Sequence, residues 1–328
     1  MPMTVRRTAP HAGKGVLALG VLTGIALTGC SAQGGAEGAG DSGDGDRIRV
    51  VTSTNVYSDL AAQVGGDRVE ATPLIRSTAQ DPHSYEATPQ DRLTVEKADL
   101  VVRNGGGYDQ FIADLSPQDQ HVVDAVDVSG LQSQQEKDAA AEHEHSHGSG
   151  EEHHHHGGFN EHVWYDVETM TKVVDRIAQQ LGEVDRQNER TYTDNAARVK
   201  DELAGVDRKI KDIGASGGYV ATEPVPGYLL EDAGLHDDTP AAFTEAIDSG
   251  SDAPPAALHE TLELVAGDHV SLLALNRQTS TGQTDRLRDT AQEAGKPVVE
   301  FTETVPDNRN YQQWMTENAD HVAKALTK

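Results

Sequence analysis

The sequence predicts an α/β fold of two lobes, each with a parallel sheet, joined by one long rigid helix. Short β-branched runs alternate with helical segments along both halves of the chain, which is typical of βαβ units. Between the halves, residues 186–213 form a single long amphipathic segment. About 280 residues remain outside the N-terminal region, a length that suits two domains or one large one.

In the first half, each expected strand is short, rich in β-branched residues, and followed by polar residues or glycine. The run RIRVVTS at 47–53 indicates a buried first strand, and the helix after it stops at Gly65 and Gly66. Gly105–Gly107 lacks the spacing of a dinucleotide fingerprint and predicts a tight turn. Strands are expected at 47–53, 69–75, 99–102 and 121–128, and helices at 55–64, at 89–98 and after His162.

The connecting helix is expected over 186–213, where five apolar residues recur at helical spacing on one face. Its 28 residues would measure roughly 42 Å, longer than a small domain is wide, which favours a rigid connector. In the second half, strands are expected at 218–222, 270–275 and 297–301, and helices at 227–233, 255–266, 284–294 and 311–326. The stripe on the connecting helix consists of Tyr192, Val199, Leu203, Val206 and Ile210.

The N-terminus indicates export and lipid anchoring. Basic residues precede an apolar run at 16–27, which is too short to span a bilayer and is typical of a signal peptide. The run ends in Leu-Thr-Gly-Cys, similar to a bacterial lipobox, which predicts lipidation of Cys30; the alternative is an ordinary signal followed by a free thiol. Cys30 is the only cysteine, so an intramolecular disulfide is excluded. Residues 1–29 are the expected signal peptide, and 30–46 a flexible tether.

A low-complexity segment at 131–158 interrupts the first lobe, which is expected over 47–185. It is rich in Gln, Glu, Ala, Gly and His, which predicts disorder. Its imidazoles indicate either an accessory site that scavenges or senses zinc, or an inert linker. The accessory residues are His143, His145, His147, His153, His154, His155 and His156.

The net charge of −27 excludes nucleic acid as a favoured partner, because such a surface repels phosphate backbones. It would concentrate cations near the protein, although charge alone gives no specificity.

Two histidines and two glutamates are candidate ligands of a divalent transition metal. His83, Glu223 and Glu303 each follow a predicted strand, and ligands bind beyond the carboxyl ends of parallel strands. His162 precedes an amphipathic helix. Two candidates come from each lobe, so the site is expected between the lobes. Carboxylates would neutralise the cation, and imidazoles favour transition metals over Ca²⁺ or Mg²⁺.

The motifs around these residues resemble those of one transport family. D-P-H-x-Y-E at 81–86, E-H-V-W at 161–164 after a His-rich loop, and the long connecting helix are similar to the cluster A-I (ZnuA/TroA/PsaA-like) metal-binding proteins of ABC importers. The resemblance covers the chain from about Arg47 to its end. It implies two (βα)₄ lobes, the second over 214–328, joined by a backbone helix, with metal held between them by His83, His162, Glu223 and Glu303.

The expected function is therefore capture of Zn²⁺, with Mn²⁺ as the alternative, and delivery to the transmembrane subunit of an ABC importer. The third ligand of zinc members is often His, whereas T-E-P places Glu223 there, which resembles manganese or iron binders. The His-rich segment favours zinc. A monomer without enzymatic activity, anchored outside the cytoplasm to the cell membrane, is expected; a metalloenzyme and a metal-stabilised adhesin are the competing hypotheses.

Overall fold

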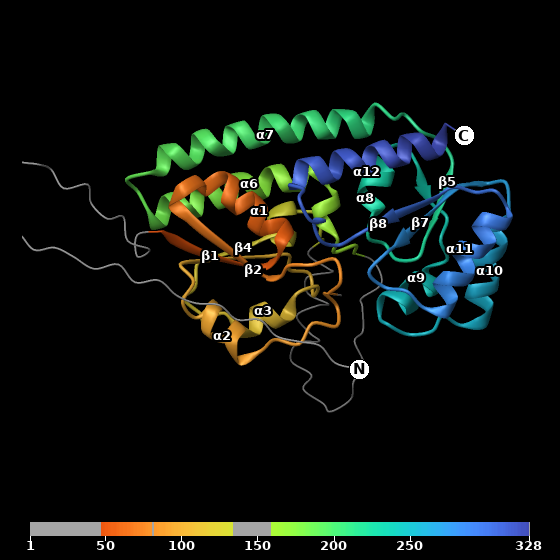
Figure 1. Ribbon diagram of the computed structural model, residues 1–328, viewed down its shortest axis with the longest axis horizontal. Coiled ribbons are helices and arrows are strands. Elements are labelled where there is room, and N and C mark those ends of the chain that lie inside the picture. Colours follow the sequence, from red (N-terminus) through yellow and green to blue (C-terminus); the bar gives the residue numbers. More distant parts are fainter. Residues whose placement is uncertain (1–46, 81, 134–158, 328) are drawn as a thin grey trace, which may run out of the picture. The chain divides into compact units, whose positions relative to one another are not determined.

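The computed structural model describes residues 47–80, 82–133 and 159–327. Within these ranges the chain forms two four-stranded parallel sheets flanked by helices, as the sequence predicts (Figure 1). The first sheet has the strand order β2-β1-β3-β4, and the second has the order β6-β5-β7-β8. The strands are β1 (Ile48–Thr54), β2 (Val69–Ile75), β3 (Leu100–Arg103), β4 (Val122–Asp124), β5 (Gly218–Ala221), β6 (His236–Asp237), β7 (Val270–Asn276) and β8 (Val298–Phe301).

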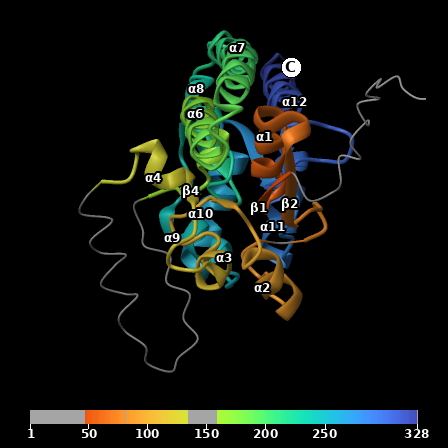
Figure 2. The same cartoon turned by 90° about the vertical axis from the view of Figure 1, so that its left-hand side faces the viewer.

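Helices cover both faces of each sheet. In the first lobe, α1 and α6 pack on one face, while α2 and α3 enclose a small separate core on the other (Figures 1 and 2). In the second lobe, α12 covers one face, and α10 and α11 cover the other. The helices are α1 (Asn55–Gly65), α2 (Pro89–Val95), α3 (Gln110–Leu115), α4 (Ala125–Ser129), α6 (Val167–Val184), α7 (Glu189–Lys211), α8 (Gly227–Asp232), α9 (Ala241–Asp248), α10 (Pro255–Ala266), α11 (Gly282–Glu293) and α12 (Tyr311–Leu326), with short 3₁₀ turns η1 (Gly66–Arg68) and η2 (Val163–Tyr165).

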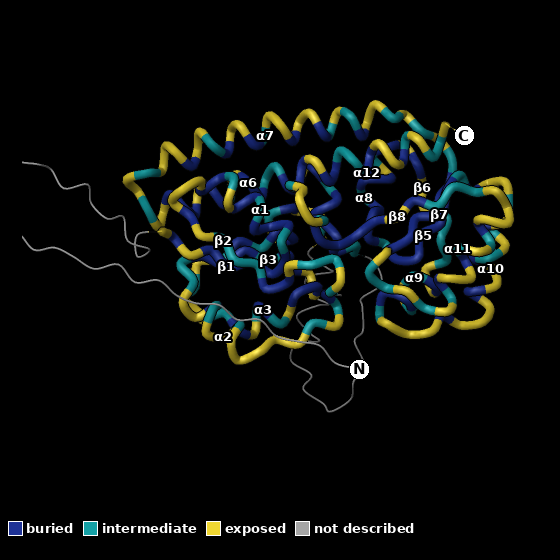
Figure 3. Tube along the Cα trace, in the orientation of Figure 1, coloured by how far each residue is buried: buried dark blue, intermediate teal, exposed yellow. Residues whose placement is uncertain are grey.

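The long helix α7 contacts helices of both lobes, namely α1 and α6 of the first and α8 and α12 of the second. It has 23 residues and lies inside the range that the sequence predicts. The apolar stripe predicted for it is buried, and exposed residues alternate with buried ones along it (Figure 3). One large hydrophobic core therefore includes residues of α7 and of both lobes.

Several helices begin at the residue where a side chain can accept from the free backbone N–H groups of the first turn. Thr88, Thr281 and Asn310 each form a capping box at the start of α2, α11 and α12. Because of these local signals, the predicted first residues of α2, α11 and α12 differ from the observed ones by two residues at most.

One predicted strand is partly wrong. The strand expected at 121–128 ends at Asp124, and α4 follows directly. The Asp124 side chain accepts from the backbone N–H of Asp127, which favours a helical turn over further extension. Helices α3 and α9 and the two-residue strand β6 were not predicted, because each is too short to show a clear hydrophobic period.

The expected signal peptide, Cys30, the tether and the histidines at 143–156 lie outside the described residues. Within the described ranges, the helices lack the combination of length and apolar character needed to cross a membrane.

The buried stripe of α7 gives a test of the shared core. Leu203 is fully buried, so Leu203→Ala should lower the free energy of unfolding by about 2–5 kcal/mol. Asp201→Ala, at an exposed position on the same helix, is the matched control and should change it by less than about 0.5 kcal/mol. Urea denaturation followed by circular dichroism measures both; equal effects would contradict the assignment of this face to the core.

Candidate metal centre

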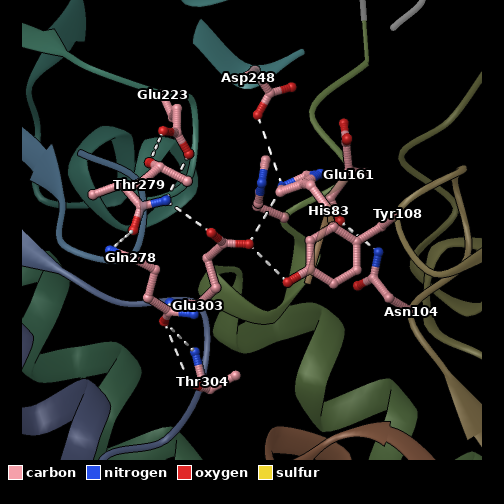
Figure 4. Close-up of polar contacts among 12 residues, drawn as sticks. His83, Asn104, Tyr108, Glu161, Glu223, Asp248, Gln278, Thr279, Glu303 and Thr304 are labelled. Atoms are coloured by element: carbon pink, nitrogen blue, oxygen red, sulfur yellow. Dashed lines mark hydrogen bonds and ion pairs between the residues drawn. The ribbon is translucent and has the colours of Figure 1, made fainter. Parts of the chain in front are cut away.

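Loops at the carboxyl ends of strands from both sheets meet at one site. His83 follows β2, Tyr108 follows β3, and Glu303 follows β8. The Tyr108 hydroxyl donates to Oε2 of Glu303 across the two lobes (2.8 Å; Figure 4). Ligands are expected beyond the carboxyl ends of parallel strands, and here loops at such ends in both lobes contribute to one site.

Three of the four predicted ligands form one compact group. One ligand atom from each of His83, His162 and Glu303 lies within 4.8 Å of the others. His162 and Glu303 are fully buried, and the His83 side chain is 13% exposed. Donor atoms this close can surround a metal ion after small side-chain movements.

The His83–Glu303 pair is ionised without metal. Nε2 of His83 lies 3.4 Å from Oε2 of Glu303. Burial lowers the pKa of His83, but the hydrogen bond and charge of Glu303, together with the charges of Asp248 and Glu161, outweigh burial and raise that pKa to about 10. Burial raises the pKa of Glu303, but the hydrogen bond and charge of His83 hold it well below its usual value. The imidazolium thus occupies the place of a cation beside the carboxylate.

The orientation of His162 leaves one nitrogen available as a ligand. Nδ2 of Asn160 donates to the carbonyl of Pro224 (2.9 Å), so Oδ1 of Asn160 is the acceptor that faces Nδ1 of His162 (2.7 Å). Nδ1 therefore carries the proton, and Nε2 carries the lone pair. In the described part of the chain, this Nε2 has no hydrogen-bond partner although the ring is fully buried. A buried acceptor without a partner is costly unless it binds something.

Glu303 is held on both oxygens. Tyr108 donates to Oε2, and Nδ2 of Asn276 donates to Oε1 (2.8 Å). Burial and then the charge of Glu303 raise the pKa of Tyr108 well above its usual value, so its hydroxyl keeps the proton that it donates. These two donors fix the carboxylate in one orientation.

Glu223, the fourth predicted ligand, lies beside this group but outside it. Nδ2 of Asn276 donates to Oε2 of Glu223 (2.6 Å) as well as to Glu303, so one amide nitrogen separates the two carboxylates. Thr279 donates to the other oxygen of Glu223. Burial, followed by the charge of Glu303, raises the pKa of Glu223 to about 8.

A further carboxylate and an aromatic wall complete the surroundings. Oδ1 of Asp248, a buried residue at the end of α9, lies 4.0 Å from Nε2 of His83. The Tyr108 ring contacts both histidine rings, with centroid distances of 4.9 Å to His83 and 5.7 Å to His162. The ring centroid of Trp164 lies 5.1 Å from that of His162. The site is thus rich in negative charge but enclosed by rings, which strengthens electrostatic attraction for a cation.

Tyr108 reaches Glu303 because of the glycine turn before it. Gly105, Gly106 and Gly107 have φ values of 80°, 66° and 94°, a left-handed conformation that other residues rarely adopt. A Cβ atom on Gly105 would lie 2.1 Å from Oδ1 of Asp124. The tight turn expected from the sequence is therefore present, and it directs the next residue into the site.

Sequence reasoning missed several residues of this site: Tyr108, Asn160, Asp248, Asn276 and Thr279. Asn276 ends β7, and Tyr108 follows the turn after β3, so the strand-end rule that selected His83 also pointed to them. Asp248 gave no comparable signal, because α9 was not predicted.

Comparison with known proteins identifies the family. The family model described as "Zinc-uptake complex component A periplasmic" matches residues 50–325. The manganese ABC transporter substrate-binding lipoprotein scaA of Streptococcus gordonii is 23% identical over 306 residues, 86% of this chain and 90% of that protein. The high-affinity zinc uptake system protein ZnuA of Bacillus subtilis is 28% identical, but the match covers only 58% of this chain and 60% of that protein.

Solved structures share the fold. The periplasmic zinc-binding protein TroA from Treponema pallidum aligns with a TM-score of 0.67 at 19% identity, covering 85% of this chain and 99% of that one. A crystal structure of ZnuA aligns with a TM-score of 0.66 at 17% identity, covering 86% and 100%. The resemblance drawn from the sequence is confirmed: the chain belongs to the family of the zinc-uptake complex component A, a family of metal-binding solute-binding proteins.

Proposed function

We propose that this protein captures a divalent transition metal, Zn²⁺ in the first place, and delivers it to the membrane subunit of an ABC importer. The metal is the transported substrate, and His83, His162, Glu303 and Glu223 are its ligands. The observation that carries the proposal is the buried Nε2 of His162, whose lone pair has no hydrogen-bond partner among the described residues and belongs to a group of three donor residues.

Metal binding would replace the proton of His83. In the protein without metal, the His83 imidazolium neutralises Glu303; a divalent ion between them would do the same with more charge. Glu223 would complete the ligand set by turning its carboxylate from Thr279 and Asn276 toward the ion. Two imidazoles and two carboxylates form a neutral complex with a divalent ion, which suits a buried site.

The relatives support capture and transport over catalysis. They are named as substrate-binding or uptake proteins for manganese and zinc. We infer the same extracytoplasmic role for this chain, as a monomer anchored through Cys30 that meets a permease. Manganese is the second candidate cargo, because two carboxylate ligands suit harder ions and a relative matched over 86% of this chain is named for manganese.

Removal of His162 tests the site. His162→Ala should weaken Zn²⁺ binding at least about a hundredfold, since loss of even an outer partner of a metal ligand costs ten- to a hundredfold. Quenching or enhancement of tryptophan fluorescence, measured in proteins that all carry Trp314→Phe, reports binding at this site, because the ring centroids of Trp164 and His162 lie 5.1 Å apart. His259→Ala, at an exposed position on α10, is the matched control. Unchanged affinity in His162→Ala would refute the site.

Proton release tests the ligands that titrate. At pH 7 His83 and Glu223 are protonated, since their pKa values are raised to about 10 and about 8. Binding should therefore release about two protons at pH 7, and apparent affinity should fall about a hundredfold per unit as pH decreases there. Calorimetry in buffers of different ionisation enthalpy measures the number.

The variant Glu223→Gln separates the proton released by Glu223 from the proton released by His83. It should bind metal with release of about one proton, because only His83 then titrates. Two protons from this variant would exclude Glu223 as a ligand, and no release from the wild type would exclude His83 as well.

Competition decides the cargo. The chain is dialysed against equimolar Zn²⁺ and Mn²⁺, and bound metal is counted by mass spectrometry in the wild type and in His162→Ala. The difference between the two is the metal of this site, free of any ions held elsewhere. We expect one Zn²⁺ by the general order of affinities; a difference of one Mn²⁺ would show that the carboxylates set selectivity.

A further inference from the structure

The side chain of Gln278 joins the His83 loop to the Glu303 loop. Gln278 follows β7, and its Oε1 accepts from the backbone N–H of Glu303 (2.7 Å) and of Thr304 (3.3 Å; Figure 4). Its Nε2 donates to the carbonyl of Gln80 (2.8 Å), three residues before His83. One side-chain amide thus binds the backbone on both sides of the lobe boundary.

Asn55 makes a second connection between the same two segments. Its Oδ1 accepts from the backbone N–H of Val305 (2.9 Å), and its Nδ2 donates to the carbonyl of Val305 (2.7 Å) and, at 3.4 Å, to that of Arg76. We call Gln278 and Asn55 the amide bracket. Segment 76–80 is therefore linked to segment 303–305 at two points.

The bracket matters because the contact between His83 and Glu303 depends on two loops far apart in sequence. The 3.4 Å contact joins ligands carried by different sheets. Of the described residues between β2 and α2, 76–80 and 82–88, none belongs to a strand or a helix. The hydrogen bonds from Gln278 to Gln80 and from Asn55 to Arg76 connect this segment to the Glu303 loop.

We propose that Gln278 is a positioning residue that sets how long the bound metal stays, by holding the His83 loop against Glu303. This inference rests on the proposed function. An amide is required because one end must accept from N–H groups and the other must donate to a carbonyl. A methionine of similar length can do neither, so Gln278→Met removes both connections with little change in volume.

The effect is expected in dissociation. Without the bracket His83 leaves the metal more readily, whereas the other ligands still receive an incoming ion. Gln278→Met should release Zn²⁺ about five to ten times faster, with an unchanged association rate, because it removes the one hydrogen bond of Gln278 that reaches the His83 segment, that to the carbonyl of Gln80. Stopped-flow Trp164 fluorescence after addition of excess chelator measures release from the full chain.

Gln283 provides the matched control. Its Oε1 accepts from the backbone N–H of Ala253 (2.8 Å) and its Nε2 donates to the carbonyl of Ala253 (3.2 Å), so it makes the same kind of link elsewhere in the second lobe. Gln283→Met should lower stability to a similar extent and leave the dissociation rate unchanged. A purely structural role for Gln278 would make the two variants alike.

A double-mutant cycle tests whether Gln278 acts through His83. In the His83→Ala background, Gln278→Met should have no further effect on metal dissociation. If it accelerates release equally in both backgrounds, or not at all in the wild type, the inference is wrong. Asn55→Ala should reproduce the faster release if Gln278→Met does not fold. Failure of the wild type itself to bind metal would instead refute the proposed function.

Discussion

A carboxylate that is ionised and fully buried is the constraint on which this site depends. Glu303 has no exposed surface, and an isolated charge in such a place would be very unfavourable. The protein compensates with the His83 imidazolium and with donors from Tyr108 and Asn276. Removal of one partner would leave the rest of the charge unbalanced. The site is therefore arranged for positive charge, which the His83 imidazolium supplies.

The donors that compensate Glu303 come from the ends of strands in both sheets. The site therefore requires the two sheets to keep a fixed position relative to each other. The connecting helix α7 and the core it shares with α1, α6 and α12 maintain this relation. Ties between lobes recur close to the ligands: Tyr165 donates to the carbonyl of Thr302, and Tyr311 donates to that of Trp164. The fold thus brings the ligand-bearing loops of the two lobes together, and buried hydrogen bonds fix their exact positions.

The sequence predicted what depends on local pattern. The strands β2, β5 and β7 and the helices α10 and α12 have clear periodicity and end signals, and their predicted bounds differ little from the structure. His83, His162 and Glu303 were predicted from their place in motifs and at strand ends. Asp248 and Gln278 could not be recognised in this way, because their roles come from contacts between segments that are distant in sequence. The position of Glu223, separated from Glu303 by one amide nitrogen, likewise depends on Asn276, more than fifty residues away.

The hydrophobic cores are organised by layer. The largest core runs through both lobes on the α7 side, whereas the outer faces of the two sheets have small cores of their own. His162 precedes Val163, and Glu303 lies between Phe301 and Val305, all members of the shared core. His83 instead precedes Tyr85, which packs against the small outer core of the first lobe. Two ligands therefore adjoin the large shared core and one adjoins a small core, so we expect local opening to begin around His83.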